Sequence, residues 1–137
     1  MREGACPCGA VHFSIDGPVR DVIVCHCNAC REATGGPWAA SAAYRSDLVV
    51  SDESALSWER AAVSEHGASR GRCRFCGTVV FWDAPARQTV SFAAATLAAP
   101  SEITVAAKIW CETWSSGGGT PTFPAGLPES FEVRWVE

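Results

Sequence analysis

Basic residues are few and dispersed in this sequence. Its 137 residues include ten arginines and one lysine against 15 acidic residues, and the formal net charge is −4. No run of neighbouring basic residues is present that could follow a phosphate backbone. Because affinity for nucleic acids depends on clustered positive charge, the sequence argues against a nucleic-acid partner.

Long apolar runs are also missing. No stretch reaches the roughly 20 apolar residues that a membrane-spanning helix requires. The first six residues contain no apolar core typical of a secretion signal. We therefore expect a cytoplasmic protein that has no membrane partner.

Cysteine, by contrast, is abundant, with eight residues at positions 6, 8, 25, 27, 30, 73, 76 and 111. In a secreted chain such a content would indicate disulfides. Without a secretion signal, the C-x-C and C-x-x-C spacings favour metal ligands, and simple burial of the thiols is the bland alternative. The length and the 47% apolar composition predict one globular domain over residues 1–137.

Short alternating segments predict a mainly β fold. Val11, Phe13 and Ile15 alternate with polar residues, which is typical of a half-buried strand. Strands are expected over residues 10–15, 19–24, 38–44, 48–50, 55–60, 79–82, 89–93 and 106–111, and residues 69–72 are expected to lead into the Cys73–Cys76 turn. One short helix is expected over residues 29–33, with Asn28 as its N-cap and glycines at its end.

The C-terminal part has a different composition. Residues 115–128 are rich in Gly, Ser and Pro and predict a flexible loop. The tail over residues 129–137 alternates again, which fits either an edge strand or an arm that packs on a neighbouring molecule.

Two Cys-bearing turns predict a first, structural zinc site. The Cys6/Cys8 pair and the Cys73/Cys76 pair are each followed directly by glycine. Together they supply the four sulfurs of a closed tetrahedral site. Because it joins residues far apart in the chain, this site would hold the fold together.

The remaining cluster, Cys25, Cys27 and Cys30, predicts a site of another kind. In an extended segment Cys25 and Cys27 face one side and His26 the other, and a turn of helix returns Cys30 to the side of the first two. Three ligands with an open fourth position are the pattern of a catalytic zinc. A site closed by Cys111 and a redox dithiol are the alternatives, but we expect Cys111 to be a lone core thiol.

Three segments carry a family resemblance. They are Gly-Ala-Cys-Pro-Cys-Gly-Ala-Val-His-Phe, Cys-His-Cys-Asn-Ala-Cys-Arg-Glu-Ala-Thr-Gly-Gly-Pro-Trp and Arg-Cys-Arg-Phe-Cys-Gly-Thr-Val-Val-Phe. In this order they resemble the glutathione-dependent formaldehyde-activating enzymes, a family that includes centromere-protein-V-like domains. The resemblance runs from about residue 4 to residue 128. One departure is Lys108, which stands where family members often carry histidine.

The resemblance implies a β-tent-like fold of small antiparallel sheets bridged by zinc. It implies a structural zinc on the first four cysteines and a catalytic or ligand-binding zinc on Cys25, Cys27 and Cys30. The reaction it implies joins glutathione, as co-substrate, and formaldehyde into S-hydroxymethylglutathione, which is formally a carbon–sulfur lyase run in reverse.

Substrate residues are expected near the second cluster. Arg31 is the first candidate for the carboxylates of glutathione, with a solvated helix residue as its alternative. Trp38 is a candidate pocket wall, with a place in the core as the alternative. His26 is expected to make a supporting hydrogen bond or to be packed, rather than to act as a base.

Three functions compete at this point. The first is a zinc-dependent enzyme that acts on a thiol adduct of a small aldehyde. The second is a non-catalytic zinc module, or a thiol carrier or sensor for protein partners. The third, nucleic-acid binding, is disfavoured by the acidic balance. The first two hypotheses differ in one testable property, which is whether the second zinc accepts an external thiol.

Overall fold

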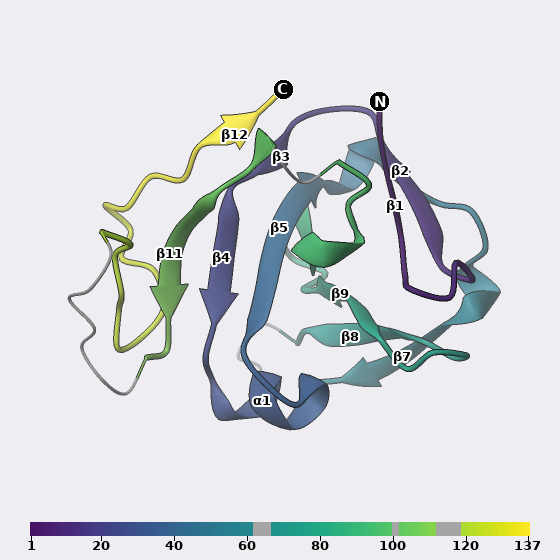
Figure 1. The fold of residues 1–137 in the computed structure, drawn as a ribbon, viewed down its shortest axis with the longest axis horizontal. Helices are drawn as coiled ribbons and strands as arrows, with labels where there is room; N and C mark the ends of the chain where they lie inside the picture. The colour runs from purple at the N-terminus through teal and green to yellow at the C-terminus, as the bar shows by residue number, and fades with distance from the viewer. Residues whose placement is uncertain (62–66, 100–101, 112–118) are drawn as a thin grey trace.

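The computed structural model describes residues 1–61, 67–99, 102–111 and 119–137. These residues form a single small, mainly β domain with one α-helix, α1 (Asn28–Thr34), as expected (Figure 1). The strands are β1 (Arg2–Ala5), β2 (His12–Ile15), β3 (Val19–Arg20), β4 (Val22–Cys25), β5 (Trp38–Tyr44), β6 (Leu48–Val50), β7 (Leu56–Arg60), β8 (Ser69–Cys73), β9 (Val79–Asp83), β10 (Thr89–Ala93), β11 (Val105–Ile109) and β12 (Trp135–Val136). Short 3-10 turns cover Arg45–Asp47, Glu53–Ala55 and Ala94–Thr96.

Two sheets divide these strands. The larger has the order β11-β4-β5-β10-β9-β8-β7, with β3 paired to β5 and β12 paired to β3, and the smaller has the order β1-β2-β6. In Figure 1, β7 and β8 cross the direction of β4 and β5 steeply, and α1 lies at the lower end of β4 and β5. The pairs are antiparallel except for β4 with β11, which is parallel. A parallel pair needs a long connection, and most of the domain lies between these two strands.

An aromatic cluster fills the space between the sheets. Phe13 lies 5.2 Å from Phe81 and 5.5 Å from Phe92, measured between ring centroids. All three rings are buried, as are Val11 and Ile15. The alternation at residues 11–15 therefore predicted the buried face correctly, and each such side chain contributes about 1.5–3 kcal/mol through burial.

Asp21 interrupts the strand that was predicted over residues 19–24. Its backbone N–H donates to the Arg134 carbonyl, so the chain forms β3 and β4 on either side of it. The buried carboxylate accepts hydrogen bonds from the Thr104 N–H at 3.0 Å and from the Arg134 guanidinium at 2.9 and 3.1 Å. Next to this Asp21–Arg134 contact, β12 pairs with β3. The tail is therefore an edge strand of its own domain, which decides between the two sequence alternatives.

Asp21→Asn is expected to destabilise the fold by about 1–3 kcal/mol, because hydrogen bonds to a charged group contribute about that much. The Arg134 hydrogen bonds lower the pKa of Asp21. A lowered folded-state pKa stabilises the protein above the unfolded value of about 4, and that contribution is lost as the pH falls through the folded value. Urea unfolding at pH 7 and below pH 4 measures the difference, which should shrink in acid.

Glu102→Gln is the matched control for this prediction. Glu102 pairs with Arg2 at 2.7 Å, but its side chain is 59% exposed. Exposed pairs contribute about 0–1 kcal/mol, so this variant should remain close to the wild type. An Asp21→Asn effect no larger than that of Glu102→Gln, or one that persists unchanged in acid, would contradict the role given to Asp21.

Two element boundaries differ from the sequence expectation. The N-cap of α1 is Cys27, whose sulfur accepts the Cys30 N–H at 3.2 Å, and Asn28 is the first helical residue. The Cys27 sulfur thus occupies the capping position that an asparagine side chain usually takes. The last core strand, predicted over residues 106–111, ends at Ile109. Trp110 follows with a left-handed φ of 57°, so Cys111 is not a strand residue.

Part of the predicted flexible loop over residues 115–128 lies outside the described residues, which resume at 119. From there the chain runs along the edge of β11. Lys108 donates its N–H to the Pro121 carbonyl at 2.9 Å, and Phe123 donates back to the Lys108 carbonyl at 2.9 Å. Among the helices in the described ranges, none has the length and apolar character to cross a membrane.

Candidate metal centres

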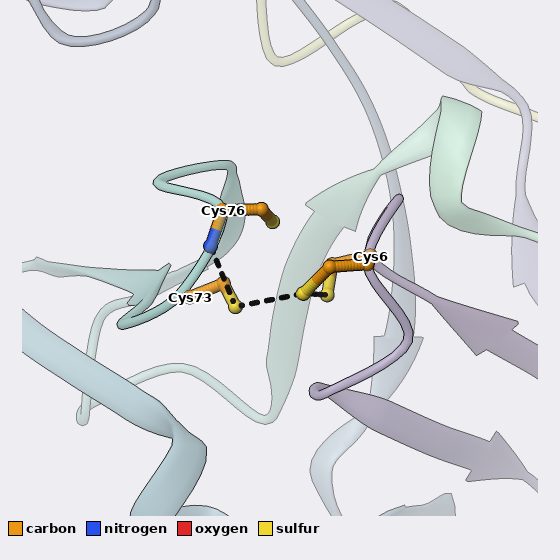
Figure 2. A group of neighbouring side chains, drawn as sticks. Cys6, Cys73 and Cys76 are labelled. Carbon is orange, nitrogen blue, oxygen red and sulfur yellow. Dashed lines mark hydrogen bonds between the residues drawn. The ribbon is translucent and has the colours of Figure 1, made fainter.

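The first cluster joins two turns that are distant in the chain. Cys6 and Cys8 lie in the connection between β1 and β2, while Cys73 ends β8 and Cys76 lies in the turn that leads to β9. Figure 2 shows the Cys6 side chain approaching the Cys73/Cys76 turn from the opposite side. The four sulfurs lie within 4.8 Å of one another.

Glycine gives the two turns the same local shape. Gly9 and Gly77 have φ values of 80° and 76°, which favour glycine over any residue with a side chain. The Gly9 N–H donates to the Cys6 carbonyl at 2.9 Å, and the Gly77 N–H donates to the Cys73 carbonyl at 3.0 Å. The Cys-Gly pattern in the sequence thus corresponds to a pair of matching turns.

The donor set fits a tetrahedral zinc. Sulfurs that each lie about 2.3 Å from a central zinc are about 3.8 Å apart. The Cys6–Cys8 and Cys8–Cys73 sulfur separations are 3.5 and 3.6 Å. Backbone N–H groups also point at the two buried sulfurs: Val11 donates to Cys6 at 3.3 Å, and Phe75 donates to Cys73 at 3.4 Å.

The second cluster is assembled where β4 meets α1. Cys25 is the last residue of β4, Cys27 caps the helix and Cys30 lies in its first turn. The three sulfurs lie within 4.8 Å of one another, as the alternation predicted. Within the described part of the chain, no fourth Cys, His, Asp or Glu joins this group.

The cluster favours a thiolate. A hydrogen bond from the Cys25 thiol is the main cause that lowers the pKa of Cys30 to about 6, with smaller contributions from Cys27 and Arg70. The proton stays on Cys25, whose pKa is raised by the same hydrogen bond. Cys30 is buried, and this burial opposes the lowering of its pKa because it disfavours the charged form.

Arg70 is a site residue that sequence reasoning missed. It lies on β8, 40 residues away, and its guanidinium is 3.9 Å from the Cys30 sulfur. The only signal in the sequence was the alternation of Arg70 and Arg72, which lie three residues and one residue before Cys73. Contact between β8 and α1 depends on the bend of the large sheet, which the local pattern did not indicate.

Cys111 is not the lone core thiol that the sequence suggested. It is half-buried and lies beyond the end of β11. Its N–H donates to the Phe123 carbonyl at 3.0 Å, and its sulfur is 3.8 Å from the Ile109 carbonyl. The left-handed turn at Trp110, which is 48% exposed, carries the chain out of the core before Cys111 is reached.

The structure places the other predicted residues around the second cluster. Arg31 is exposed, and its Nε donates to the His26 carbonyl at 3.1 Å. Trp38 pairs with Cys25 across β5 and β4, so the two side chains leave the same face of the sheet. The His26 Nε2 atom is buried without a hydrogen-bond partner in the described residues, and burial lowers the pKa of this histidine.

A solved structure shares this fold. A crystal structure of a Rhodobacter sphaeroides protein superposes with a TM-score of 0.57 at 21% identity. The match covers 88% of the present chain and 98% of that chain. No curated protein matches the sequence.

A family model supplies the assignment. The model described as glutathione-dependent formaldehyde-activating enzyme matches residues 1–113. This range includes both cysteine clusters, Arg70 and the two Cys-Gly turns. The chain therefore belongs to the family of glutathione-dependent formaldehyde-activating enzymes.

Proposed function

We propose that the protein is a zinc-dependent enzyme of the carbon–sulfur lyase type, acting on the glutathione adduct of a small aldehyde such as formaldehyde. One observation carries the proposal. The sulfurs of Cys25, Cys27 and Cys30 lie together, and the described residues offer no fourth side-chain ligand. Three protein ligands with one open position are the arrangement of catalytic zinc sites.

The two clusters have separate roles in this proposal. Cys6, Cys8, Cys73 and Cys76 would hold a structural zinc, and Cys25, Cys27 and Cys30 would hold the second one. When bound, the second zinc would keep an incoming thiol ionised near neutral pH. Such chemistry requires reduced cysteines, which is consistent with a cytoplasmic location.

The reaction is an addition of a thiol to a carbonyl. A bond forms between the glutathione sulfur and the formaldehyde carbon, while the π bond of the carbonyl breaks and its electron pair goes to oxygen. The thiol proton ends on that oxygen, which gives S-hydroxymethylglutathione without any oxidant or reductant. Holding both reactants side by side lowers the barrier by removing the entropy cost of their encounter.

Residues of this chain would position the thiol. Arg70 already lies 3.9 Å from the Cys30 sulfur, so its positive charge faces the place where sulfur anions gather. Arg31 follows Cys30 directly in α1 and is exposed, so its guanidinium would meet a carboxylate of the substrate. Trp38 leaves the sheet on the same face as Cys25 and would form a wall of the pocket.

The proposal predicts two zinc ions per chain, one of which responds to glutathione. Protein purified under reducing conditions should contain both, and cobalt exchanged into the labile site should report thiol binding through its visible bands. Glutathione should change these bands, whereas oxidised glutathione, which has no free thiol, should not. Two metals that both ignore glutathione would instead favour the non-catalytic zinc module.

A further inference from the structure

Strand β7 is an open edge of the large sheet. Within the described residues it pairs with β8 alone, and in Figure 1 it runs along the lower margin of the sheet. Two other edges are partly covered, because Lys108 of β11 exchanges hydrogen bonds with residues 121 and 123 and Gly4 of β1 forms a bridge to Leu97. With five residues, β7 is the longest described strand whose outer edge has no such cover.

The register with β8 decides which backbone groups of β7 face outward. The Ala61 N–H donates to the Ala68 carbonyl at 2.9 Å, directly beyond the end of the strand pair. Hydrogen-bonded positions alternate along an antiparallel pair, so the odd-numbered residues of β7 bond to β8. Leu56, Trp58 and Arg60 therefore direct their N–H and C=O groups away from β8. Such a row of outward groups is a template for another strand.

Trp58 gives this edge a firmly held apolar surface. Its ring stacks on Phe81 with 6.3 Å between the centroids. It also passes close over Gly71, where an added Cβ would lie 3.0 Å from the ring. Despite both contacts Trp58 stays 46% exposed. Tryptophan is among the residue types that most often anchor protein interfaces.

Strand β7 lacks the features that usually protect an edge from pairing. It contains no proline and no lysine, and its register with β8 runs without a bulge. Its two charged residues, Glu59 and Arg60, cancel each other. A second strand of the same sequence can therefore approach without net charge repulsion.

We infer that β7 pairs antiparallel with β7 of a second copy of this chain, across a two-fold axis at Trp58. The contact is self-complementary, as two-fold interfaces are. Trp58 then lies opposite Trp58 of the second copy, Leu56 lies opposite Arg60, and Ser57 lies opposite Glu59. In this register every outward backbone group of the strand meets an outward group of the other copy.

The neighbouring registers are less favourable. An axis at Glu59 would place this carboxylate directly opposite the same carboxylate of the second copy, and like charges in that position are destabilising. An axis at Ser57 would leave Arg60 beyond the end of the other strand, because β7 begins at Leu56. The axis at Trp58 avoids both faults.

Sedimentation velocity on the full, metal-containing chain under reducing conditions tests this pairing. The wild type should pass from monomer to dimer between about 1 µM and about 1 mM, the range expected for a small interface. Amide hydrogen exchange at Trp58 and Arg60 should slow as the dimer forms. In the monomer these two N–H groups face away from β8 and exchange quickly.

Arg60→Pro tests the backbone contact. Proline is tolerated on an edge strand where the N–H faces outward, so the pairing with β8 should persist. The variant removes one hydrogen bond from each copy, and its dimer dissociation constant should rise about 5- to 100-fold. Arg60→Ala is the matched control, because it removes the same side chain but keeps the N–H. Its dissociation constant should stay within about 3-fold of the wild type.

Ser57→Glu and Ser57→Lys test the register. Opposite Glu59 of the second copy, the glutamate should weaken the dimer about 2- to 30-fold and the lysine should strengthen it. Within one chain Ser57 lies opposite Arg72 of β8, so the glutamate should favour the fold and the lysine should not. The effects on dimerisation and on the melting temperature should thus have opposite signs.

Two results would overturn the inference. One is a chain that stays monomeric at every concentration, which would leave the edge to an extended segment of a different protein. The other is a dimer that neither Arg60→Pro nor the two Ser57 variants affect, since its interface would lie elsewhere. If Arg60→Pro does not fold, the comparison of Ser57→Glu with Ser57→Lys decides.

Discussion

Cys8→Ser is expected to be recovered unfolded or to be lost during expression. Cys8 connects the two turns of the first cluster, with sulfur separations of 3.5 Å to Cys6 and 3.6 Å to Cys73. In small zinc domains the metal contributes about 10–16 kcal/mol to folding, while a whole domain is stable by only about 5–15 kcal/mol. Weakening this site therefore removes a contribution of the same size as the total stability.

Circular dichroism and the yield of soluble protein measure this loss. Cys111→Ser is the matched control, because Cys111 belongs to neither cluster in the described structure. Its melting temperature should stay within a few degrees of the wild type. A Cys8→Ser protein that folds and melts like Cys111→Ser would show that the first cluster does not hold the fold.

Cys27→Ser is expected to fold normally but to contain one zinc instead of two and to lose its response to glutathione. Cys27 has two tasks, as a cluster ligand and as the N-cap of α1 through the hydrogen bond from the Cys30 N–H. Serine is itself a favourable N-cap, so it can replace the sulfur in the second task. It cannot replace a thiolate ligand, so the effect should fall on metal and thiol binding.

Metal analysis, thermal melting and the cobalt titration follow this variant together. A cap changes stability by about 0.5–2 kcal/mol, so the melting temperature should move by no more than about 10 °C. Cys27→Ala separates the two tasks, because it removes the cap as well and should be the less stable of the pair. Equal melting behaviour of Cys8→Ser and Cys27→Ser would show that the division into structural and functional clusters is wrong.

The contrast between these variants follows from where each cluster lies in the fold. The first cluster bridges the small and the large sheet through residues 65 or more positions apart, as the Cys8–Cys73 contact shows. The second cluster is contained in the six residues that join β4 to α1. A metal that closes a long loop removes much unfolded-chain entropy, whereas one that closes a short loop removes little.

Local chemistry made much of this protein predictable. The spacing of Cys25, Cys27 and Cys30 placed three sulfurs on one side, because strand alternation and one helical turn depend only on neighbouring residues. The alternation around Phe13 predicted the buried face of β2 for the same reason. The Cys-Gly pairs predicted two matching turns, since only glycine adopts their left-handed φ without strain.

The features that the sequence did not reveal depend on residues far apart in the chain. Asp21 breaks a strand because Arg134, 113 residues later, returns to bind it. Strand β1 was missed because its four residues become a strand only through pairing with β2.

The same division applies to the site. The sequence by itself determined the family motif, the two cysteine clusters and the mainly β class, because each is written in residue types at short spacing. Only the tertiary structure brought Arg70 to the Cys30 sulfur and Arg72 to the end of α1. The bend of the large sheet, which carries β8 back against the helix, results from packing of the whole core and leaves no trace in the local pattern.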